Sequence, residues 1–223
     1  MHIAIPKDQH DAIKSLNIDE HRTACAYEHW QKTFPTGTYL APHIEIIKES
    51  LGNDFTRSEV VEFYKRDVNV VTKFIAAMIW GHEAPAGSRR DSRGPWKLSK
   101  MFAKPQDAEK AIQSVSLQTN QEITQAYIRL NKALDRCGPN FFTKHFYFLG
   151  KSQDINPYPL IFDDRVASGL IKTALSSYSE MDMVQVSALR KPTAYLNYLA
   201  FAKQEADRIG CSIDQIEYHL FNL

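Results

Sequence analysis

Cysteine is scarce in this sequence, and its three residues, Cys25, Cys137 and Cys211, lie far apart. An odd number of widely separated cysteines argues against a disulfide framework and against a four-cysteine zinc or iron–sulfur site. The eight histidines are also scattered, with no His-Glu-x-x-His run and no Cys/His cluster. We therefore predict that the protein binds no metal ion and no cofactor.

Long apolar runs and an excess of one charge are missing too. The first residues, Met1 to Asp8, lack the apolar run of a signal peptide, and no stretch approaches the roughly 20 apolar residues of a membrane span. With 43% hydrophobic and 24% charged residues, the composition is typical of a soluble globular protein. The net charge of +1 carries no information about a polyanionic partner. We expect a cytoplasmic protein with no membrane partner.

Helical periodicity runs through most of the chain. Apolar residues recur at helical spacing within residues 19–34, 39–51, 69–80, 105–115, 120–136, 140–149, 164–177 and 192–209, and further helices are expected from Thr56 and after Ser212. No alternating strand pattern extends beyond a few residues. We predict an all-α fold of roughly ten helices in a single domain, residues 1–223, with residues 1–18 as an N-terminal arm or short helix.

Several helix ends carry capping signals. Two segments have the spacing of a capping box: Thr56 with Glu59, and Ser212 with Gln215. Asn120 is a plausible N-cap. Three glycines are expected to end helices: Gly81, Gly150 and Gly210.

Cations gather between Arg89 and Lys104, where six of them face a single aspartate and the local charge is +5. They are Arg89, Arg90, Arg93, Lys97, Lys100 and Lys104. Glycines and prolines break the helical periodicity, so a loop is expected here. Two interpretations stay open, a solvated loop or a phosphate-binding surface. Trp96 and two other apolar residues among the cations favour a loop that docks on a partner or on the domain.

A Gly-Pro turn, Gly138-Pro139, separates two of the predicted helices. A helix that begins directly after such a turn leaves backbone N–H groups unpaired in its first turn, where the helix dipole also favours negative charge. Gly138 permits the close approach of another backbone, and Pro139 suits a first helical position because its missing N–H is no loss. The corner is either an ordinary tight turn between helices or a phosphate-binding site.

Asp163 and Asp164 stand directly before the next helical pattern, so one of them is the expected N-cap. Backbone N–H donors at such a cap favour the ionised carboxylate. An ionised aspartate beside a sugar can activate a water or stabilise an oxocarbenium-like transition state, which is what cleavage of a glycosidic bond requires. Capping and catalysis are compatible at this position.

The order of these features, a hairpin followed about 25 residues later by an aspartate, resembles the helix-hairpin-helix DNA glycosylases. Members of that family read approximately Gly-x-Gly-x-Lys at the hairpin and apolar-Asp-x-x-Val at the downstream helix. The corresponding segments here are Arg136-Cys137-Gly138-Pro139-Asn140 and Phe162-Asp163-Asp164-Arg165-Val166. The chain is most similar to small bacterial proteins of the 8-oxoguanine glycosylase type, over about residues 60–223, with further similar phrases at Trp80-Gly81, Gly94-Pro95-Trp96 and Ile216-Glu217-Tyr218-His219-Leu220-Phe221.

The resemblance implies both an architecture and a set of site residues. It implies two helical lobes with a DNA-binding cleft between them, the hairpin within about residues 120–150, and a catalytic helix from residue 163. It implies that Asp163 is catalytic and that the hairpin residues Gly138 and Pro139 contact DNA. The cations expected on DNA are Arg136, Arg165, Arg89, Arg90, Arg93, Lys97 and Lys100.

The chain departs from the family pattern at Asn140, which stands where bifunctional members place the Schiff-base lysine. Asn140 has no amine to attack the sugar. Lys144 lies four residues further on, so it shares a helix face with Asn140 and can reach the same cleft, although a phosphate contact or a solvated cation would also explain it. We therefore expect a monofunctional glycosylase, in which water attacks with the help of Asp163. The alternative is β-lyase activity through Lys144.

A glycosylase must extrude its base from the stack and hold it in a pocket of aromatic and polar groups. The candidates for that pocket are Trp96, Phe141, Tyr195 and Tyr198, with Trp80 and Phe142 also considered. Trp96 and Tyr198 are preferred because polar or cationic neighbours flank both. For each of these aromatic residues, ordinary core packing is the competing explanation.

Three classes of function remain open at this stage. The first is a DNA glycosylase acting on an altered base in DNA, either 8-oxoguanine or a related oxidised purine in repair, or a bulky base such as glucosylated hydroxymethylcytosine of phage DNA in defence. The second is a helix-hairpin-helix module that binds DNA without catalysis. The third is an unrelated helical interaction protein. As a glycosylase, the protein is expected to be a nucleoid-associated monomer.

Overall fold

The computed structural model describes residues 4–82, 93–176 and 191–223. Within these ranges the chain forms twelve α-helices, one 3₁₀ turn and one two-stranded sheet, so the predicted all-α fold is confirmed. In chain order the elements are η1 (Lys7–Gln9), α1 (His10–Lys14), β1 (Arg22–Ala24), α2 (Tyr27–Thr33), α3 (Ala41–Leu51), β2 (Asp54–Thr56), α4 (Arg57–Lys65), α5 (Val70–Trp80), α6 (Arg93–Met101), α7 (Pro105–Gln113), α8 (Asn120–Ala133), α9 (Pro139–Ser152), α10 (Asp164–Ser176), α11 (Pro192–Ile209) and α12 (Ile213–Asn222). None of these helices is long and apolar enough to cross a membrane.

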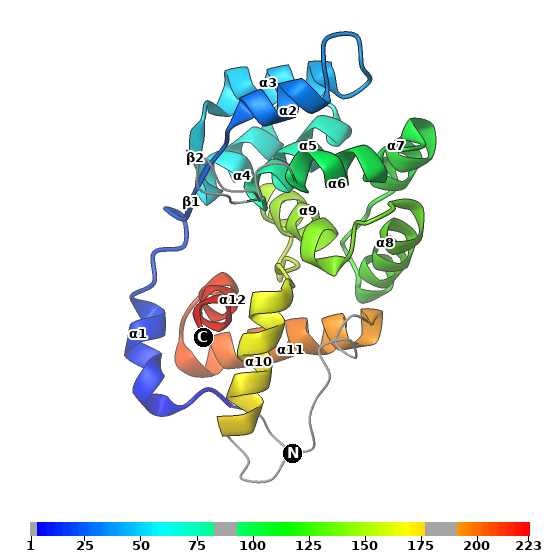
Figure 1. Ribbon diagram of the computed structural model, residues 1–223. Helices are drawn as coiled ribbons and strands as arrows, with labels where there is room; N and C mark the ends of the chain where they lie inside the picture. The colour runs from blue at the N-terminus through cyan, green and yellow to red at the C-terminus, as the bar shows by residue number, and fades with distance from the viewer. Residues whose placement is uncertain (1–3, 83–92, 177–190) are drawn as a thin grey trace.

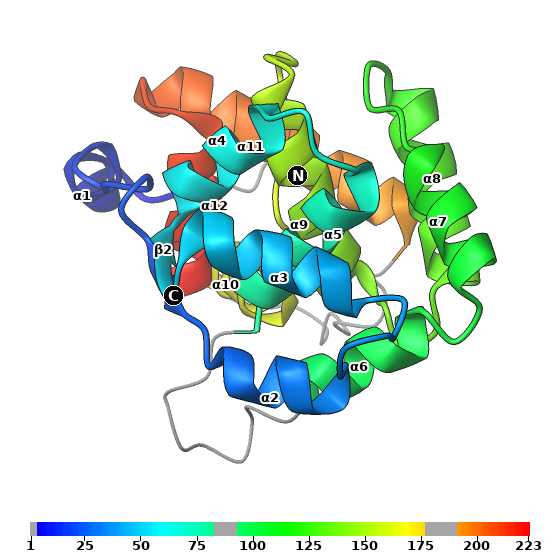
Figure 2. The same cartoon turned by 90° about the horizontal axis from the view of Figure 1, so that it is seen from above.

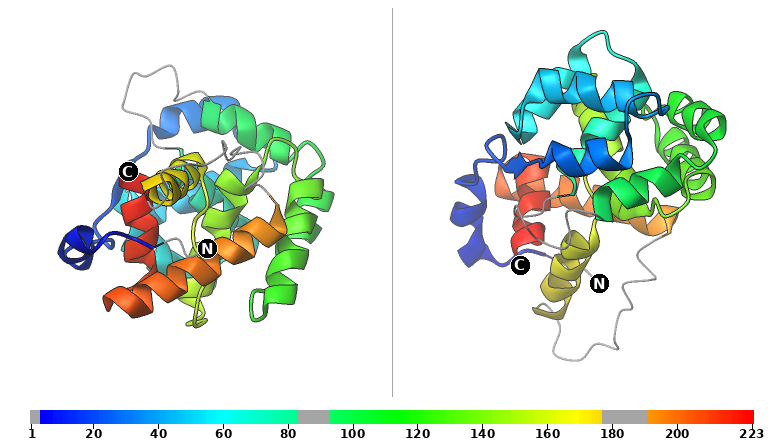
Figure 3. Two further views of the ribbon diagram at one scale, coloured as in Figure 1. Left: turned by 90° about the horizontal axis from the view of Figure 1, so that it is seen from below. Right: turned by 45° about the horizontal axis from the view of Figure 1, so that its top comes forward.

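The helices gather in two groups (Figure 1). Helices α2 to α9 form the larger group, and α1, α10, α11 and α12 form the smaller one at the other end of the molecule. Seen from above, α2 lies beside α6 at one edge of the larger group (Figure 2). In the smaller group, α10 and α11 both pack against α12 (Figure 3). The chain passes between the groups through the segment after α1 and again through the loop between α9 and α10.

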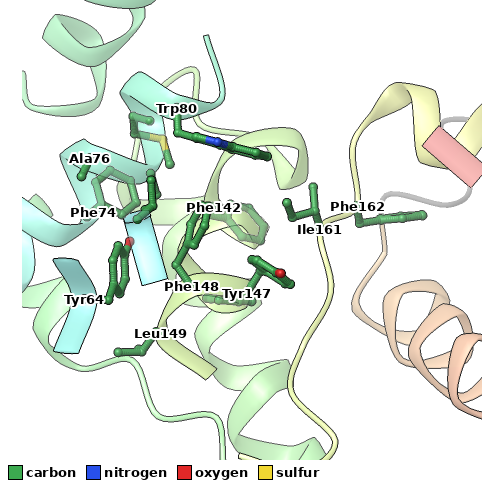
Figure 4. Close-up of a cluster of buried hydrophobic side chains, with 14 of the residues drawn as sticks. Tyr64, Phe74, Ala76, Trp80, Phe142, Tyr147, Phe148, Leu149, Ile161 and Phe162 are labelled. Atoms are coloured by element: carbon green, nitrogen blue, oxygen red, sulfur yellow. The ribbon is translucent and has the colours of Figure 1, made fainter. Parts of the chain in front are cut away.

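Helices α5 and α9 form the centre of the larger group and pack on each other. Nearly every residue of α5 is buried, which is why its sequence is apolar on all sides rather than along one stripe. Its Phe74 meets His145 of α9 edge to face at 5.3 Å, and Trp80 meets Phe148 at 5.2 Å. Figure 4 shows Phe74, Trp80 and Phe148 within one cluster of buried side chains, with Ile161 and Phe162 extending from the loop that precedes α10.

Close packing of α10 on α12 depends on Gly169. A Cβ at this position would lie 2.0 Å from the backbone oxygen of Leu220, so only glycine allows the two helices to approach this far. The N-terminal segment covers the other side of the smaller group, where Ile13 is fully buried and α1 contacts α12. The predicted N-terminal arm is therefore a short helix docked on the domain.

One helix prediction was wrong. Residues 19–34 were expected to be helical throughout, but residues 22–24 form β1, and α2 begins only at Tyr27. β1 pairs antiparallel with β2, with Thr23 opposite Phe55. Each strand has three residues, which is too short for an alternating pattern to stand out from helical spacing.

Capping signals were predicted with mixed success. Reciprocal capping boxes at Thr56 and Ser212 are confirmed. The cap of α8 is Thr119 rather than Asn120, because Thr119 and Glu122 form a third capping box. Gly150 does not end α9, which continues to Ser152. A Cβ at residue 150 would meet Pro159 Cδ at 2.8 Å, so the glycine serves packing instead.

The expected loop after residue 82 contains a helix. Residues 93–101 form α6, in which Gly94 and Pro95 occupy the first turn, where proline is tolerated because N–H groups there have no helical partner. Leu98 is buried on one face, and Trp96 is 47% exposed on another. Arg89 and Arg90 lie outside the described residues.

Candidate active site

A pocket of about 230 Å³ opens where the two groups of helices meet. Both groups contribute to its wall, and so does the segment that joins them. The lining residues are His21, Arg57, Trp80, Gly81, Lys144, Ile161, Asp163, Arg165, Glu217 and Phe221. Cations and carboxylates therefore face one small space, beside aromatic rings.

Lys144 projects from α9 into this pocket and is only 6% exposed. Its Nζ donates to the backbone oxygen of Asn140 at 2.6 Å and lies 3.4 Å from Asp163 Oδ2. Gly81, at the end of α5, makes room for the lysine stem, since a Cβ at residue 81 would lie 2.4 Å from Lys144 Cδ. The amine is thus held beside a carboxylate in a largely water-excluded space.

Asp163 performs the capping role expected from the sequence. Its Oδ1 accepts hydrogen bonds from the backbone N–H groups of Arg165 and Val166, both at 3.1 Å. Its Oδ2 faces Lys144, so one carboxylate links the start of α10 to the pocket. The cap fixes the orientation of the side chain, and the second oxygen stays directed at the amine.

The segment before Asp163 is held by hydrogen bonds from buried side chains. The hydroxyl groups of Tyr195 and Tyr198 donate to the backbone oxygens of Leu160 and Ile161, at 2.7 and 3.1 Å. Both tyrosines are at most 1% exposed and neither lines the pocket. The structure therefore gives Tyr195 and Tyr198 a packing and positioning role beside the pocket, and the base contact predicted for them stays a prediction.

Asn140 does not point into the pocket. Its Nδ2 donates to Asp164 Oδ2 at 2.6 Å, which joins the start of α9 to the start of α10. The side chain that reaches the pocket from this face of α9 is that of Lys144, one helical turn further on. The two residues share a helix face, as expected, but only the side chain of Lys144 lines the pocket.

In the hairpin between α8 and α9, Arg136 has a φ of 59°, which lies in the left-handed region. Gly138 has φ −80° and N-caps α9, with Pro139 as the first helical residue, as expected. Apart from its two chain neighbours, no atom of the described residues lies within 4 Å of the place where a Cβ of Gly138 would stand. The start of α9 is therefore open to the approach of another molecule.

A basic groove of about 560 Å³ borders this hairpin. It runs between the ends of α6 and α8, and its charged lining residues are Lys100, Lys104, Lys132, Arg136 and Asp135. It brings together three residues predicted to bind DNA, namely Lys100, Arg136 and Gly138. Cations outnumber the one aspartate, so the groove suits a polyanion.

The other residues predicted to contact DNA lie in the pocket and on α6. Arg165 lines the pocket with its guanidinium 3.8 Å from the centre of the Phe221 ring. On α6, Arg93 and Lys97 lie near the start of the helix, and Lys97 Nζ sits 4.2 Å over the ring of Phe141. None of these residues lines the basic groove.

Trp96 and Phe141 lie outside the pocket that holds Lys144. Trp96 is exposed, with Lys100 Nζ 6.0 Å from its ring. Phe141 stacks on His82 at 4.7 Å, and burial, with the charges of Lys97 and Lys144, lowers the pKa of His82 to about 3. This neutral histidine and its aromatic neighbour form a separate patch next to the end of α5.

The pair formed by Arg57 and Glu217 was not predicted from the sequence. Arg57 Nη1 donates to Glu217 Oε2 at 2.7 Å, and both side chains are at most 2% exposed. Burial opposes the charge of Arg57, but the carboxylate of Glu217 raises the pKa of Arg57 overall. The pair joins residues 160 positions apart in the chain, so no local sequence pattern predicts it.

In the described ranges no group of three or more His, Cys, Asp or Glu side chains is arranged to hold a metal ion. A family model described as "Putative 8-oxoguanine DNA glycosylase OGG-like protein" matches residues 16–221, a range that includes the hairpin, Lys144 and Asp163. No curated protein and no solved structure matches the chain. Because the match spans almost the whole sequence, this chain belongs to the 8-oxoguanine DNA glycosylase OGG-like family, for which DNA is the implied partner.

Proposed function

We propose that the protein releases a damaged base from DNA with Lys144 as the attacking amine and Asp163 as the stabilising carboxylate. The observation that carries this proposal is the position of Lys144 Nζ, 3.4 Å from Asp163 Oδ2 in the wall of a pocket between the helix groups. An amine and a carboxylate at this separation supply the nucleophile and the anionic partner that cleavage at C1′ requires.

The reaction follows from these two groups. With the altered nucleotide extruded into the pocket, the lone pair of Lys144 Nζ attacks C1′, a C1′–N bond to the lysine forms, and the bond to the base breaks. The base leaves with the electron pair of that bond and takes up a proton lost from the lysine nitrogen, while Asp163 stabilises the positive charge that develops on the sugar. Opening of the sugar ring gives a Schiff base, and loss of a C2′ proton then expels the 3′ phosphate.

This mechanism revises the monofunctional enzyme expected from the sequence. That expectation rested on Asn140, which offers no amine and is bonded to Asp164 outside the pocket. Lys144 supplies the amine from one turn further along α9. Attack by a water molecule oriented by Asp163 is the second candidate, supported by the exposure of 15% that the Asp163 side chain retains.

The size of the pocket supports a small altered base. Its volume of about 230 Å³ is below the roughly 300–1,000 Å³ of sites that enclose drug-sized ligands. An oxidised purine such as 8-oxoguanine suits this space better than a cytosine that carries a hexose. We therefore propose a repair role in the cytoplasm, in preference to defence against phage.

The DNA backbone would follow the hairpin and the basic groove. The open start of α9 at Gly138 suits one phosphate, and Lys100, Lys104 and Lys132 suit phosphates further along the same strand. Both surfaces and the pocket belong to one chain, so we propose that the protein acts as a monomer.

The test is a panel of oligonucleotides that contain 8-oxoguanine, uracil, alkylated purines or glucosylated hydroxymethylcytosine, with mass spectrometry of released bases and borohydride trapping of the enzyme on DNA. Lys144→Gln should abolish trapping and strand cleavage, and Asp163→Asn should abolish base release. Lys14→Gln, at an exposed lysine of α1, is the matched control. Base release with breaks only after alkali would favour attack by water, and DNA binding without release would favour a non-catalytic module.

A further inference from the structure

Two hydrogen-bond donors in the pocket wall have no partner. Trp80 Nε1 and Arg57 Nε are buried, and neither makes a hydrogen bond within the described part of the chain. Their residues are 3% and 1% exposed and line the same pocket as Lys144 and Asp163. A buried donor without a partner loses its hydration and gains no bond in return, and roughly 90% or more of buried polar groups are paired. Two such donors in one wall point to an acceptor on the ligand.

An acceptor lies beside these donors. Glu217 Oε2 is engaged by Arg57 Nη1 at 2.7 Å, but Glu217 Oε1 lies 3.5 Å from Arg57 Nη2, at the limit of a hydrogen bond. A carboxylate oxygen has two lone pairs, so Oε1 keeps the capacity to accept from an N–H group of a ligand. The wall thus presents donors and an acceptor side by side.

These groups are held rigidly. The guanidinium of Arg57 lies 5.2 Å from the ring centre of Trp80, 5.0 Å from that of Tyr147 and 5.8 Å from that of Tyr218. Surrounded by three rings and tied to Glu217, Arg57 cannot turn to find another partner. A preorganised donor of this kind discriminates strongly, because a ligand without the matching acceptor leaves it unpaired.

The arrangement is complementary to one kind of base edge. A guanine-type edge presents a carbonyl acceptor next to N–H donors, whereas an adenine-type edge presents an amino donor where the carbonyl would be. We infer that Trp80 Nε1, Arg57 Nε and Glu217 Oε1 read the carbonyl and imino edge of the extruded base and so determine which base is released. The inference rests on the proposed glycosylase function and adds the residues that select its substrate.

A purely structural role for the Arg57–Glu217 pair explains fewer of these observations than base recognition does. The pair joins α4 to α12, and the contact between Nη1 and Oε2 is sufficient for that purpose. It does not account for the unpaired donor of Trp80, a residue that belongs to a different helix and lines the same pocket. A ligand carbonyl would accept hydrogen bonds from both Trp80 and Arg57.

The experiment compares Trp80→Phe with the wild-type protein on DNA that contains 8-oxoguanine, 8-oxoadenine or a preformed abasic site. Phenylalanine keeps an aromatic ring at this position and removes the indole N–H group together with the five-membered ring, a loss of volume that the same change at Trp30 reproduces. Trp30→Phe is the matched control, because Trp30 is 5% exposed and lies outside the pocket. Melting temperatures of both variants establish that they are folded.

We expect Trp80→Phe to reduce kcat/KM for 8-oxoguanine release about tenfold, with a much smaller change for 8-oxoadenine and for cleavage at the abasic site, which carries no base. Equal losses on all three DNAs, or no loss at all, would overturn the inference and leave the glycosylase proposal standing. A wild-type protein that releases no base and cleaves no abasic site would instead overturn the proposed function, and this inference with it.

Discussion

Lys144 passes directly over Gly81, so closely that a Cβ on residue 81 would overlap Lys144 Cδ at 2.4 Å and Cε at 2.6 Å. The lysine comes from α9 and the glycine from the end of α5, the two central helices of the larger group. The missing side chain at residue 81 therefore determines the path by which the amine reaches Asp163. This relationship can be tested without touching either of the proposed catalytic groups.

Gly81→Ala should displace the amine of Lys144 and leave the fold intact. The backbone at residue 81, with φ −78° and ψ −3°, is open to alanine, and the clash is with a flexible side chain. The melting temperature should change by no more than the few degrees that correspond to about 1 kcal/mol. Borohydride trapping on an abasic site should fall about 100-fold, as expected for a misplacement of about 1 Å. Unchanged trapping would show that the path of Lys144 past Gly81 is unimportant.

Gly138→Ala should weaken DNA binding without affecting the fold. With φ −80° and, among the described residues other than its chain neighbours, no atom within 4 Å of a Cβ, alanine fits. Its lower entropy in the unfolded chain and its poorer N-cap propensity oppose each other, so stability should change by no more than about 1 kcal/mol. If a phosphate approaches the start of α9, the added methyl group should raise the Kd for DNA several-fold. The salt dependence of binding should stay the same, because no charge is removed. Equal affinities of the variant and the wild type would place the hairpin away from DNA.

The basic groove makes a separate, charge-based prediction. In a triple variant, glutamine replaces Lys100, Lys104 and Lys132. This variant should have a smaller slope of log K against log salt, by about 0.9 for each DNA phosphate that these lysines neutralise in the wild type. Binding isotherms at several salt concentrations measure this slope.

A control with the same change in net charge replaces three exposed lysines outside the groove: Lys7, Lys14 and Lys65. Its slope should stay close to that of the wild type. Equal slopes for the two triple variants would mean that the DNA does not follow the groove.

The sequence predicted those parts of the site that depend on local structure. Asp163 caps α10 through N–H groups two and three residues away, and the capping box at Thr56 spans four residues. Signals of this kind are complete within one turn of helix, so they can be recognised without the fold. The long apolar helix α5 was predictable for a similar reason, because apolar residues on every face of a helix indicate that it is buried on all sides.

The pocket itself was beyond prediction, because its residues are brought together only by packing. Asn140 and Lys144 share a helix face, and their spacing could not tell which one reaches the pocket. The hydrogen bond from Asn140 to Asp164 and the space above Gly81 decide that question. Likewise, Arg57 and Glu217 form an ion pair although they are 160 positions apart in the sequence, and no local sequence pattern at either residue identifies its partner.

Acid should destabilise the fold through His145. This residue is fully buried, its Nδ1 lies 2.9 Å from the hydroxyl of Tyr64, and burial, with the charge of Lys73, lowers the pKa of His145 to about 3. In the unfolded chain the histidine takes up a proton near pH 6.5. The stability it contributes is therefore complete above pH 6.5 and is lost as the pH falls towards 3, by about 1.4 kcal/mol per pH unit.

Urea unfolding at pH 7.5 and pH 5 measures this loss. In His145→Gln the amide can still pair with Tyr64 but does not titrate, so the variant should lose less stability between the two pH values than the wild type. His82, whose pKa is also lowered to about 3, titrates in both proteins and cancels in the comparison, as do the carboxylates. An equal loss in both proteins would mean that His145 is already protonated in the fold, or that the core opens to admit the charge before the chain unfolds.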